Sequence, residues 1–389
     1  MADASKPAHV SSFEGSSLQS VEWLRVVLDE AHKIRNRSTK QYKAVLSLQA
    51  RHRWCLSGTP IFNGVEDFGS LLGFLGAQPF NAPSTFKSWV VSPVKSRRGK
   101  GLEALRKLVQ ATCLRRMKED VAGELRLATC HKPICEVELS GEERALYNVL
   151  KTSFAALIGD AASPRGRGAA ASGSTGIFQT ILRLRQFCNH GGDLLPPNLR
   201  ELLQYSAVDR EREGALVLAD NSCACCGHAH GPSEVTEGVP LPDIIFSCWT
   251  GMLDLVEEAL YQENLEFARI DGGVSEPARR EAIARFRSDE GCNILLASIG
   301  SAGVGLDLTV ASRVHLLEPQ WTPTAEAQAL DRVHRIGQTQ EVIARRYIVK
   351  DSIEEYIVNV QQVKTALINQ SFATEEQEHP ESARERLAK

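Results

Sequence analysis

Two groups of side chains, far apart in the chain, have the types and spacing for chemistry on phosphate groups. Asp29 and Glu30 follow an apolar run at residues 23–28 that has the length of a buried strand. Near the other end of the chain, Arg332 and Arg335 are spaced for one face of a helix. A carboxylate pair can bind Mg²⁺ and activate water, and planar guanidinium groups suit phosphate oxygens.

The carboxylate pair lies where open α/β sheets bind ligands, just past the end of a strand. In that position Asp29 would hold Mg²⁺ through its water shell, and Glu30 would orient or deprotonate an attacking water molecule. The alternative is that the two acidic side chains only stabilise the N-terminus of a helix.

A glycine-containing loop precedes the arginines. An apolar strand candidate at residues 294–297 leads into a loop with Gly303 and Gly305, and a second strand candidate follows at 314–317. Glycines let the backbone approach a ligand closely, and backbone N–H groups in such loops often bind phosphate.

The arginines themselves are expected on a helix. Thr322 is the expected N-cap, Pro323 occupies the first helical position, and Gly337 ends the helix. Arg332 and Arg335 would then share a polar face, which suits either a phosphate site or an ordinary solvated surface.

Composition sets the outer limits. The chain has 389 residues, enough for two or three domains, and its 45 Lys and Arg against 48 Asp and Glu give a net charge of −3. This balance excludes a strongly basic protein that coats nucleic acid, although it allows a local basic groove. The sequence shows neither a membrane-spanning run nor a signal peptide, and its ten cysteines favour thiols in a reducing compartment.

The residue strings resemble those of the Swi/Snf family of helicase-like DNA translocases. GLDL at 305–308 replaces the commoner GLNL, and QALDRVHRIGQ at 328–338 is almost unchanged. LDEAH at 28–32 and LSGTP at 56–60 are similar to the Walker B and coupling motifs of the family. The resemblance extends from about residue 21 to residue 367.

The resemblance implies ATP and Mg²⁺ as cofactors and assigns two sets of residues. The nucleotide-binding set is Gly303, Gly305, Asp307, Arg332 and Arg335, and the metal is held by Asp29. The coupling set, Ser57, Gly58 and Thr59, would link the nucleotide site to the lobe that grips DNA. Taken alone, SGTP is typical of a simple turn.

The resemblance also implies binding to double-stranded DNA, with nucleosomes as a further partner and the nucleus as the location. The matching positions are Arg115 and Arg116 in a helical insertion, and Ser247, Gly272 and Ser298 in loops of the second lobe. Contacts of this kind go to phosphates, so binding would depend on salt and hardly on base sequence.

A cluster of cysteine and histidine residues could form a zinc site. Cys223 and Cys226 have C-x-x-C spacing, and His228 and His230 could complete four ligands. The DNA-repair branch of the family often carries a RING finger at this place, but a RING needs a second, interleaved set of ligands that this sequence lacks. The alternative is a remnant or a disordered loop.

The expected fold class is α/β, with two RecA-like lobes built on parallel sheets, an incomplete first lobe and helical insertions between the lobes. The expected divisions are a disordered lead-in (1–20), a partial first lobe with its insertion (21–135), a helical linker with a flexible segment at 161–176 and the Cys/His insert (136–241), the second lobe (242–367) and a charged tail (368–389). Residues 347–367 are expected to be helical.

One expected motif is missing. Phosphoryl transfer uses a G-x-x-x-x-G-K-[ST] loop, which occurs nowhere in the 389 residues. Two hypotheses follow. The first is an ATP-dependent DNA translocase of DNA repair or chromatin remodelling. It would be a DNA-dependent ATPase by family, but the 389 residues alone would not hydrolyse ATP because the first lobe is truncated. The second is a non-hydrolysing DNA- or protein-binding fragment that keeps the C-terminal helicase lobe.

Overall fold

The computed structural model describes residues 18–61, 64–96, 99–116, 127–161, 170–191, 242–288, 291–302 and 306–372. The chain divides into two compact units. The first consists of Met1–Arg115 and Lys364–Lys389, and the second of Arg116–Val363. The described strands pair in parallel throughout, so the expected α/β class with parallel sheets is confirmed.

In the first unit, two parallel strands carry the first group of candidate residues. β1 (Glu22–Leu28) pairs with β2 (Gln49–Cys55), close to the strands expected from the sequence. Backbone hydrogen bonds continue past the ends of both strands. Leu56 N–H donates to the Leu28 carbonyl, and Ala31 N–H donates to the Leu56 carbonyl. The segments that follow the two strands are therefore fixed against each other.

Helices complete the first unit. α1 (Lys40–Leu46) begins at Thr39, whose hydroxyl accepts from Tyr42 N–H. The other helical segments of the unit are η1 (Ala31–Ile34), α2 (Val65–Leu75), α3 (Pro83–Phe86), the π-helix η2 (Lys87–Val91), α4 (Ser92–Lys95) and α5 (Gly99–Thr112). Apolar side chains of α2, α3, η2 and α5 form a core that also packs Leu367, Ile368 and Phe372 from the end of α14 (Ile353–Phe372).

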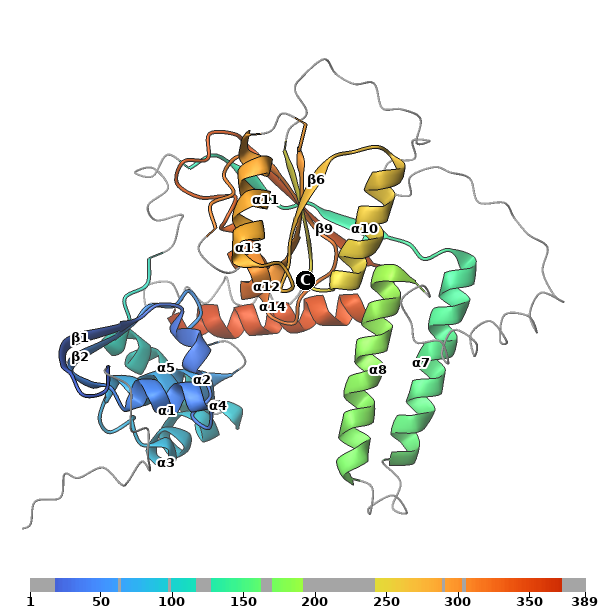
Figure 1. Ribbon diagram of the computed structural model, residues 1–389. Coiled ribbons are helices and arrows are strands. Elements are labelled where there is room, and N and C mark those ends of the chain that lie inside the picture. The colour runs from blue at the N-terminus through green and yellow to red at the C-terminus, as the bar shows by residue number, and fades with distance from the viewer. Residues whose placement is uncertain are drawn as a thin grey trace, which may run out of the picture. The chain divides into compact units, whose positions relative to one another are not determined.

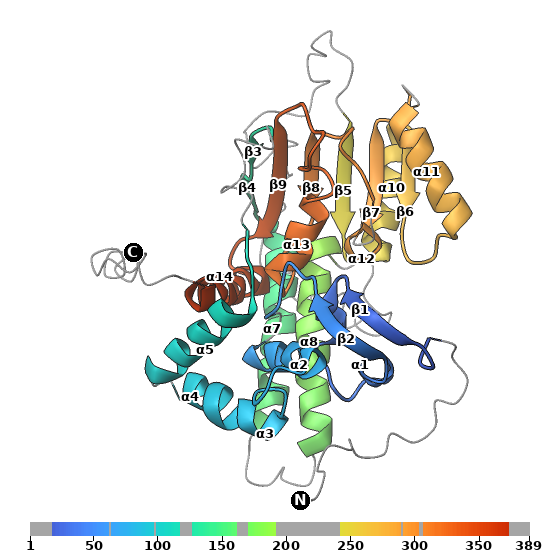
Figure 2. The same cartoon turned by 90° about the vertical axis from the view of Figure 1, so that its left-hand side faces the viewer.

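The second unit is built on a parallel sheet. Its order among the described residues is β3-β9-β8-β5-β7-β6, with β4 also paired to β9 (Figure 2). The strands are β3 (Cys130–His131), β4 (Ile134–Val137), β5 (Asp243–Ser247), β6 (Phe267–Ile270), β7 (Ile294–Ser298), β8 (Arg313–Leu316) and β9 (Val342–Val349). β5 lies inside the sheet, bonded to β7 and β8, so its C-terminal end is flanked by those of two other strands.

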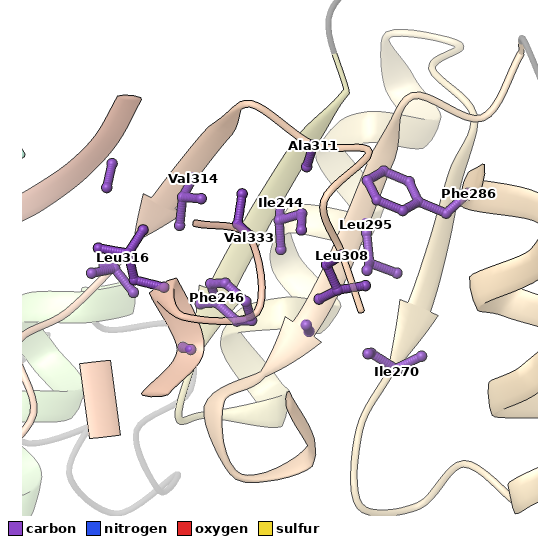
Figure 3. Packing of buried hydrophobic residues seen from close by; sticks show 14 of the residues in the cluster. Ile244, Phe246, Ile270, Phe286, Leu295, Leu308, Ala311, Val314, Leu316 and Val333 are labelled. Carbon is purple, nitrogen blue, oxygen red and sulfur yellow. The ribbon is translucent and has the colours of Figure 1, made fainter. Parts of the chain in front are cut away.

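Helices cover both faces of this sheet, as the continuous apolar run in β7 requires. α10 (Thr250–Gln262) lies on one side, and α11 (Glu276–Ser288) and α13 (Pro323–Leu330) lie on the other (Figure 1). Buried side chains of β5, β7 and β8 meet those of α11 and α13 in the main core, which Figure 3 shows around Phe246 and Leu308.

A pair of long helices lies in sequence between β4 and β5. α7 (Gly141–Ala161) and α8 (Ala170–His190) lie side by side (Figure 1). α7 begins with a capping box, in which Ser140 N–H donates to Glu143 and Glu143 N–H donates to the Ser140 hydroxyl. α7 and α8 share a small core that also contacts Ile353.

Two expectations about helices were wrong. Residues 347–367 do not form one helix, because β9 extends to Val349 and α14 begins at Ile353. β9 takes strand geometry because β8 and β4 offer backbone partners on both of its edges. The segment 161–176, expected to be flexible from its Gly, Ala and Ser content, contains the first turns of α8.

Within the part of the chain that the structure describes, no helix has the length and apolar character needed to cross a membrane.

A buried acid in the first turn of α14 makes the stability of the second unit depend on pH. Glu354 is 2% exposed and accepts a hydrogen bond from Val349 N–H at 2.8 Å. Burial, reinforced by the negative charge of Glu318, raises its pKa to about 7 from an ordinary value of 4.5. The folded state therefore keeps a proton that the unfolded chain releases between these two values, so stability falls as pH rises through this window.

We expect Glu354→Gln to stabilise the chain at pH 8 relative to pH 5, because glutamine still accepts from Val349 but cannot ionise. The difference is on the order of 3 kcal/mol. Calorimetric unfolding at both pH values measures it, with Glu355→Gln on the exposed side of the same turn as the matched control. Equal pH dependence in the wild type and Glu354→Gln would contradict the assignment.

Candidate functional site

The expected Mg²⁺ ligand is placed as the sequence predicts. Asp29 follows β1 directly and is exposed, and its Oδ1 accepts from Glu30 N–H at 2.8 Å. Its other oxygen has no protein partner among the described residues and can bind water or a cation. Glu30 takes the left-handed conformation, with φ 49° and ψ 47°, at the start of η1. A non-glycine residue in that region is strained, and such strain gathers at functional sites.

His32 connects the carboxylate motif to the expected coupling motif. Its Nδ1 lies 3.3 Å from Glu30 Oε2 and 3.5 Å from Ser57 Oγ. Burial lowers the pKa of His32 below its usual value, although Glu30 acts to raise it, so the imidazole is neutral at pH 7. Ser57 Oγ also accepts from Thr59 N–H at 3.1 Å, and this bond shapes the turn that contains Gly58. The two motifs therefore form one hydrogen-bonded group.

In the second unit, the arginine pair does not lie on a helix, and the expected helix from Thr322 to Gly337 was too long. Thr322 and Pro323 begin α13 as expected, but α13 ends at Leu330. Arg332 and Arg335 lie in the tight turns that follow, where Arg332 is half-buried and Arg335 is exposed.

The helix ends early because other groups occupy the carbonyls that would extend it. Arg332 O accepts from Leu308 N–H at 2.9 Å, and Val333 O accepts from the Gln338 side chain at 3.4 Å. Gln338 is 5% exposed, and its Nε2 also donates to Thr309 O at 3.0 Å and to Ala311 O at 2.7 Å. The turns after α13 are thus held against the loop that begins at residue 306.

The same contacts bring Asp307 near Arg335. Asp307 is exposed, and its Oδ1 accepts from the Thr309 hydroxyl at 2.9 Å. Burial acts to raise the pKa of Asp307, but the Thr309 hydrogen bonds and the charges of Arg287 and Arg335 outweigh it, so the pKa lies below its ordinary value. The expected nucleotide-binding residues Asp307, Arg332 and Arg335 therefore belong to one folded segment, whereas Gly303 and Gly305 lie outside the described residues.

The expected DNA-contacting positions lie at the C-terminal edge of the sheet, but Ser247 and Ser298 are not in loops as expected. They are the last residues of β5 and β7, where they lie opposite each other. Gly272 is exposed in a turn after β6, where Asp271 Oδ1 accepts from Gly273 N–H. Ser298 donates its hydroxyl proton to Ser301 Oγ at 2.7 Å. Ser247 is fully buried and donates to Glu318 Oε2 at 3.0 Å, so its one side-chain donor is used inside the unit.

The structure offers less support for the roles of the remaining predicted residues. Arg115 and Arg116 are exposed, but they follow the end of α5 in a segment without helical structure, and the Arg115 guanidinium lies over the Phe372 ring at 4.6 Å. The candidate zinc ligands Cys223, Cys226, His228 and His230 lie outside the described residues, so the zinc site stays a prediction.

The two groups of candidate phosphate-binding residues lie in separate units, each of which contains parallel strands. Two family models match the chain. An SNF2-related domain matches residues 10–193, and a helicase conserved C-terminal domain matches residues 239–337. The chain belongs to the SNF2 family of helicase-like ATPases, in the branch of its DNA-repair relatives, and the resemblance seen in the sequence is confirmed.

Relatives of this branch match almost the whole chain. A helicase-like transcription factor from Oryctolagus cuniculus is 32% identical, over 92% of this chain and 44% of its own length. The DNA repair protein RAD5B of Arabidopsis thaliana is 28% identical, over 95% of this chain and 36% of its own length. A solved SWI2/SNF2 ATPase core of Sulfolobus solfataricus in complex with dsDNA is 27% identical, over 91% of this chain and 69% of that one, with a TM-score of 0.42. The chain spans less than half the length of these two curated relatives.

Sequence reasoning missed two residues that hold the site together. His32 lies inside the LDEAH string but was given no role, and only its distance to Ser57 reveals that it joins two motifs. Gln338 ends the RVHRIGQ string, and its burial could not be predicted because an exposed helix end was expected there. A polar residue directly after a glycine turn is the one signal that could have suggested it.

We expect Gln338→Leu to destabilise the second unit by about 1 to 3 kcal/mol, because it leaves buried carbonyls of Thr309 and Ala311 without their donor. Chemical denaturation measures the change. Gln340→Leu, two residues away and exposed, is the control and should have little effect. Equal stability of the two variants would show that the Gln338 amide does not hold this turn.

Proposed function

We propose that this chain is part of an ATP-dependent translocase that acts on double-stranded DNA in repair or chromatin remodelling, in the nucleus. One observation supports this most strongly. Both conserved halves of an SNF2 ATPase match, and in each half the phosphate-directed residues are gathered, Asp29 with Glu30 in the first unit and Asp307 with Arg335 in the second. The names of the relatives, a helicase-like transcription factor and DNA repair proteins, support the same assignment.

The described residues fit Mg²⁺ and ATP. The exposed carboxylate of Asp29, with one oxygen available at the end of a parallel strand, suits an ion that prefers carboxylate and water oxygens. The metal would supply charge neutralisation on the phosphates. Glu30 would orient or deprotonate the attacking water, and Arg332 and Arg335 would bind phosphate oxygens.

His32 suggests how the nucleotide site communicates with the DNA-binding part of the protein. Its ring nitrogen faces both Glu30 and Ser57, so a change in the position of Glu30 during the reaction would alter the contact to Ser57. We propose that Ser57, Gly58 and Thr59 transmit this change. Buried Thr59 Oγ1 has no hydrogen-bond partner among the described residues and is available for a rearranged contact.

Contact with duplex DNA is proposed at the C-terminal edge of the second unit's sheet, around Gly272, Ser298 and the loop that begins at Ser247. Arg115 and Arg116 are further proposed contacts. These contacts would go to phosphates. Nucleosomes are a further proposed partner.

The second candidate function is a DNA- or protein-binding module without turnover. It is favoured by one observation, that the 389 residues contain no G-x-x-x-x-G-K-[ST] loop. We therefore propose that this polypeptide alone hydrolyses ATP negligibly, and that turnover requires such a loop in addition.

Two measurements test these proposals. In fluorescence anisotropy, we expect the 389-residue chain to bind two unrelated duplexes equally, with affinity that falls steeply as salt rises. In an ATPase assay we expect negligible turnover with or without DNA. Absence of DNA binding at low salt would contradict the translocase assignment, and DNA-stimulated hydrolysis abolished by Glu30→Gln would instead show a complete site.

In a polypeptide that joins these residues to a Gly-Lys-Thr loop, we expect Arg335→Ala to lower kcat by about 10³ or more, because it removes a phosphate-binding guanidinium. The control is Arg285→Ala, which removes a surface arginine of α11 that pairs with Glu266. Unchanged turnover in Arg335→Ala would remove this residue from the site.

A further inference from the structure

The loop between β5 and α10 is held by a buried carboxylate. Glu318, 1% exposed, follows β8 and accepts hydrogen bonds on both oxygens. Oε2 accepts from Ser247 Oγ and from Asn189 Nδ2, each at 3.0 Å. Oε1 accepts from Cys248 N–H and from Gln320 Nε2. One charge therefore joins the end of β5, the segment after β8, and α8.

A buried arginine of α8 reaches the same loop. Arg185 is 7% exposed, and its Nη2 donates to Pro319 O at 3.0 Å and lies 3.9 Å from Cys248 Sγ. Its guanidinium carbon lies 5.5 Å from the ring centre of Trp249 and 5.8 Å from that of Trp321. Both distances are within the range of cation–π attraction, which is strong where water is excluded.

The cation–π contact with Arg185 is the contact that can fix Trp249. The indole Nε1 of Trp249 is buried and has no hydrogen-bond partner among the described residues, so hydrogen bonding does not orient the ring there. Its backbone N–H donates to Ser247 Oγ at 3.0 Å. Because Trp249 is the N-cap residue of α10, fixing it also fixes the first turn of that helix.

The alternative is that Arg185 and Glu318 only stabilise the fold. A buried ion pair adds little net stability, because removing its charges from water costs about as much free energy as their attraction returns. Such charges can instead fix the geometry of the groups around them. Here both side chains contact one short loop, because Glu318 accepts from Ser247 and Cys248 and Arg185 lies over Trp249, at the ligand-binding end of a parallel sheet.

We propose that Arg185 and Glu318 are positioning residues that hold the β5–α10 loop in the shape that meets the DNA backbone, so that helix α8 controls DNA affinity without touching DNA. This inference rests on the proposed DNA-binding function. It assigns Ser247 an internal role, because its hydroxyl donates a hydrogen bond to Glu318.

The first test follows the loop itself by hydrogen exchange of peptides that cover residues 247–250. Arg185→Met and Glu318→Gln should each raise exchange of these amides at least roughly tenfold. In Glu318→Gln an NH2 group replaces one of the two acceptor oxygens, so either Cys248 N–H or Ser247 Oγ, which accepts from Trp249 N–H, loses its partner. Arg185→Met removes the guanidinium that lies over the Trp249 ring. The matched control is Arg183→Met, two residues away on α8, where the guanidinium bonds to Gln186. Unchanged exchange in both Arg185→Met and Glu318→Gln would overturn the proposal.

The second test measures duplex DNA affinity by fluorescence anisotropy. Arg185→Met should bind roughly tenfold or more weakly than Arg183→Met, although both lose one positive charge. Arg185→Lys should not restore binding, because an ammonium group lacks the planar fork of donors by which the guanidinium reaches Pro319 O and Cys248 Sγ. Restoration by lysine, or equal affinity of the two methionine variants, would overturn the positioning role.

The outcomes separate the two proposals. If the wild-type chain does not bind DNA, the proposed function fails, while the exchange data still decide whether Arg185 and Glu318 hold the loop. If the wild type binds and the exchange rises without loss of affinity, the proposed function stands and this inference is wrong. Calorimetric unfolding of each variant confirms that the second unit is folded.

Discussion

The second unit depends on keeping a negative charge out of water. Glu318 is almost fully buried, and a buried carboxylate is tolerated only where donors surround it. Its donors come from the end of β5, from α8 and from its own loop. Burial raises the pKa of Glu318, and these hydrogen bonds with the charge of Arg185 oppose that rise. Three segments distant in sequence must therefore meet at one point.

This requirement gives the helix pair a role beyond connecting β4 to β5. α8 precedes β5 and β8 in sequence, yet two of its polar side chains, Arg185 and Asn189, contact the segments that follow the C-terminal ends of these strands. These ends are where open α/β sheets bind ligands. A helix that looked only amphipathic and basic in the sequence thus belongs to the functional edge of the sheet.

The first unit shows a different constraint, local backbone strain. Glu30 takes a positive φ that costs a non-glycine residue on the order of 1 kcal/mol. The conformation lets its carboxylate approach His32, which in turn lies near Ser57. Strain at Glu30 and convergence of two motifs on one imidazole are both typical of a working site rather than a simple turn.

Much of the site could be predicted because its residues lie in short strings with their own local chemistry. The strand before Asp29, the turn at Ser57 and the start of α13 at Pro323 all follow from patterns of a few residues. The end of α13 could not be predicted, because Arg332 O is taken by Leu308, 24 positions earlier in the chain. Helical periodicity carries no information about such a partner.

The sequence by itself determined the α/β class, the SNF2 family and the positions of the phosphate-directed residues, since these depend on local apolar runs and on motif strings. Only the tertiary structure decided that the arginines lie on turns, that the Ser247 hydroxyl donates a hydrogen bond to Glu318, and that the Arg185 guanidinium lies over two indole rings. The physical reason is that a buried polar group takes whichever partner the fold brings near, and that partner is set by the packing of segments far apart in the chain.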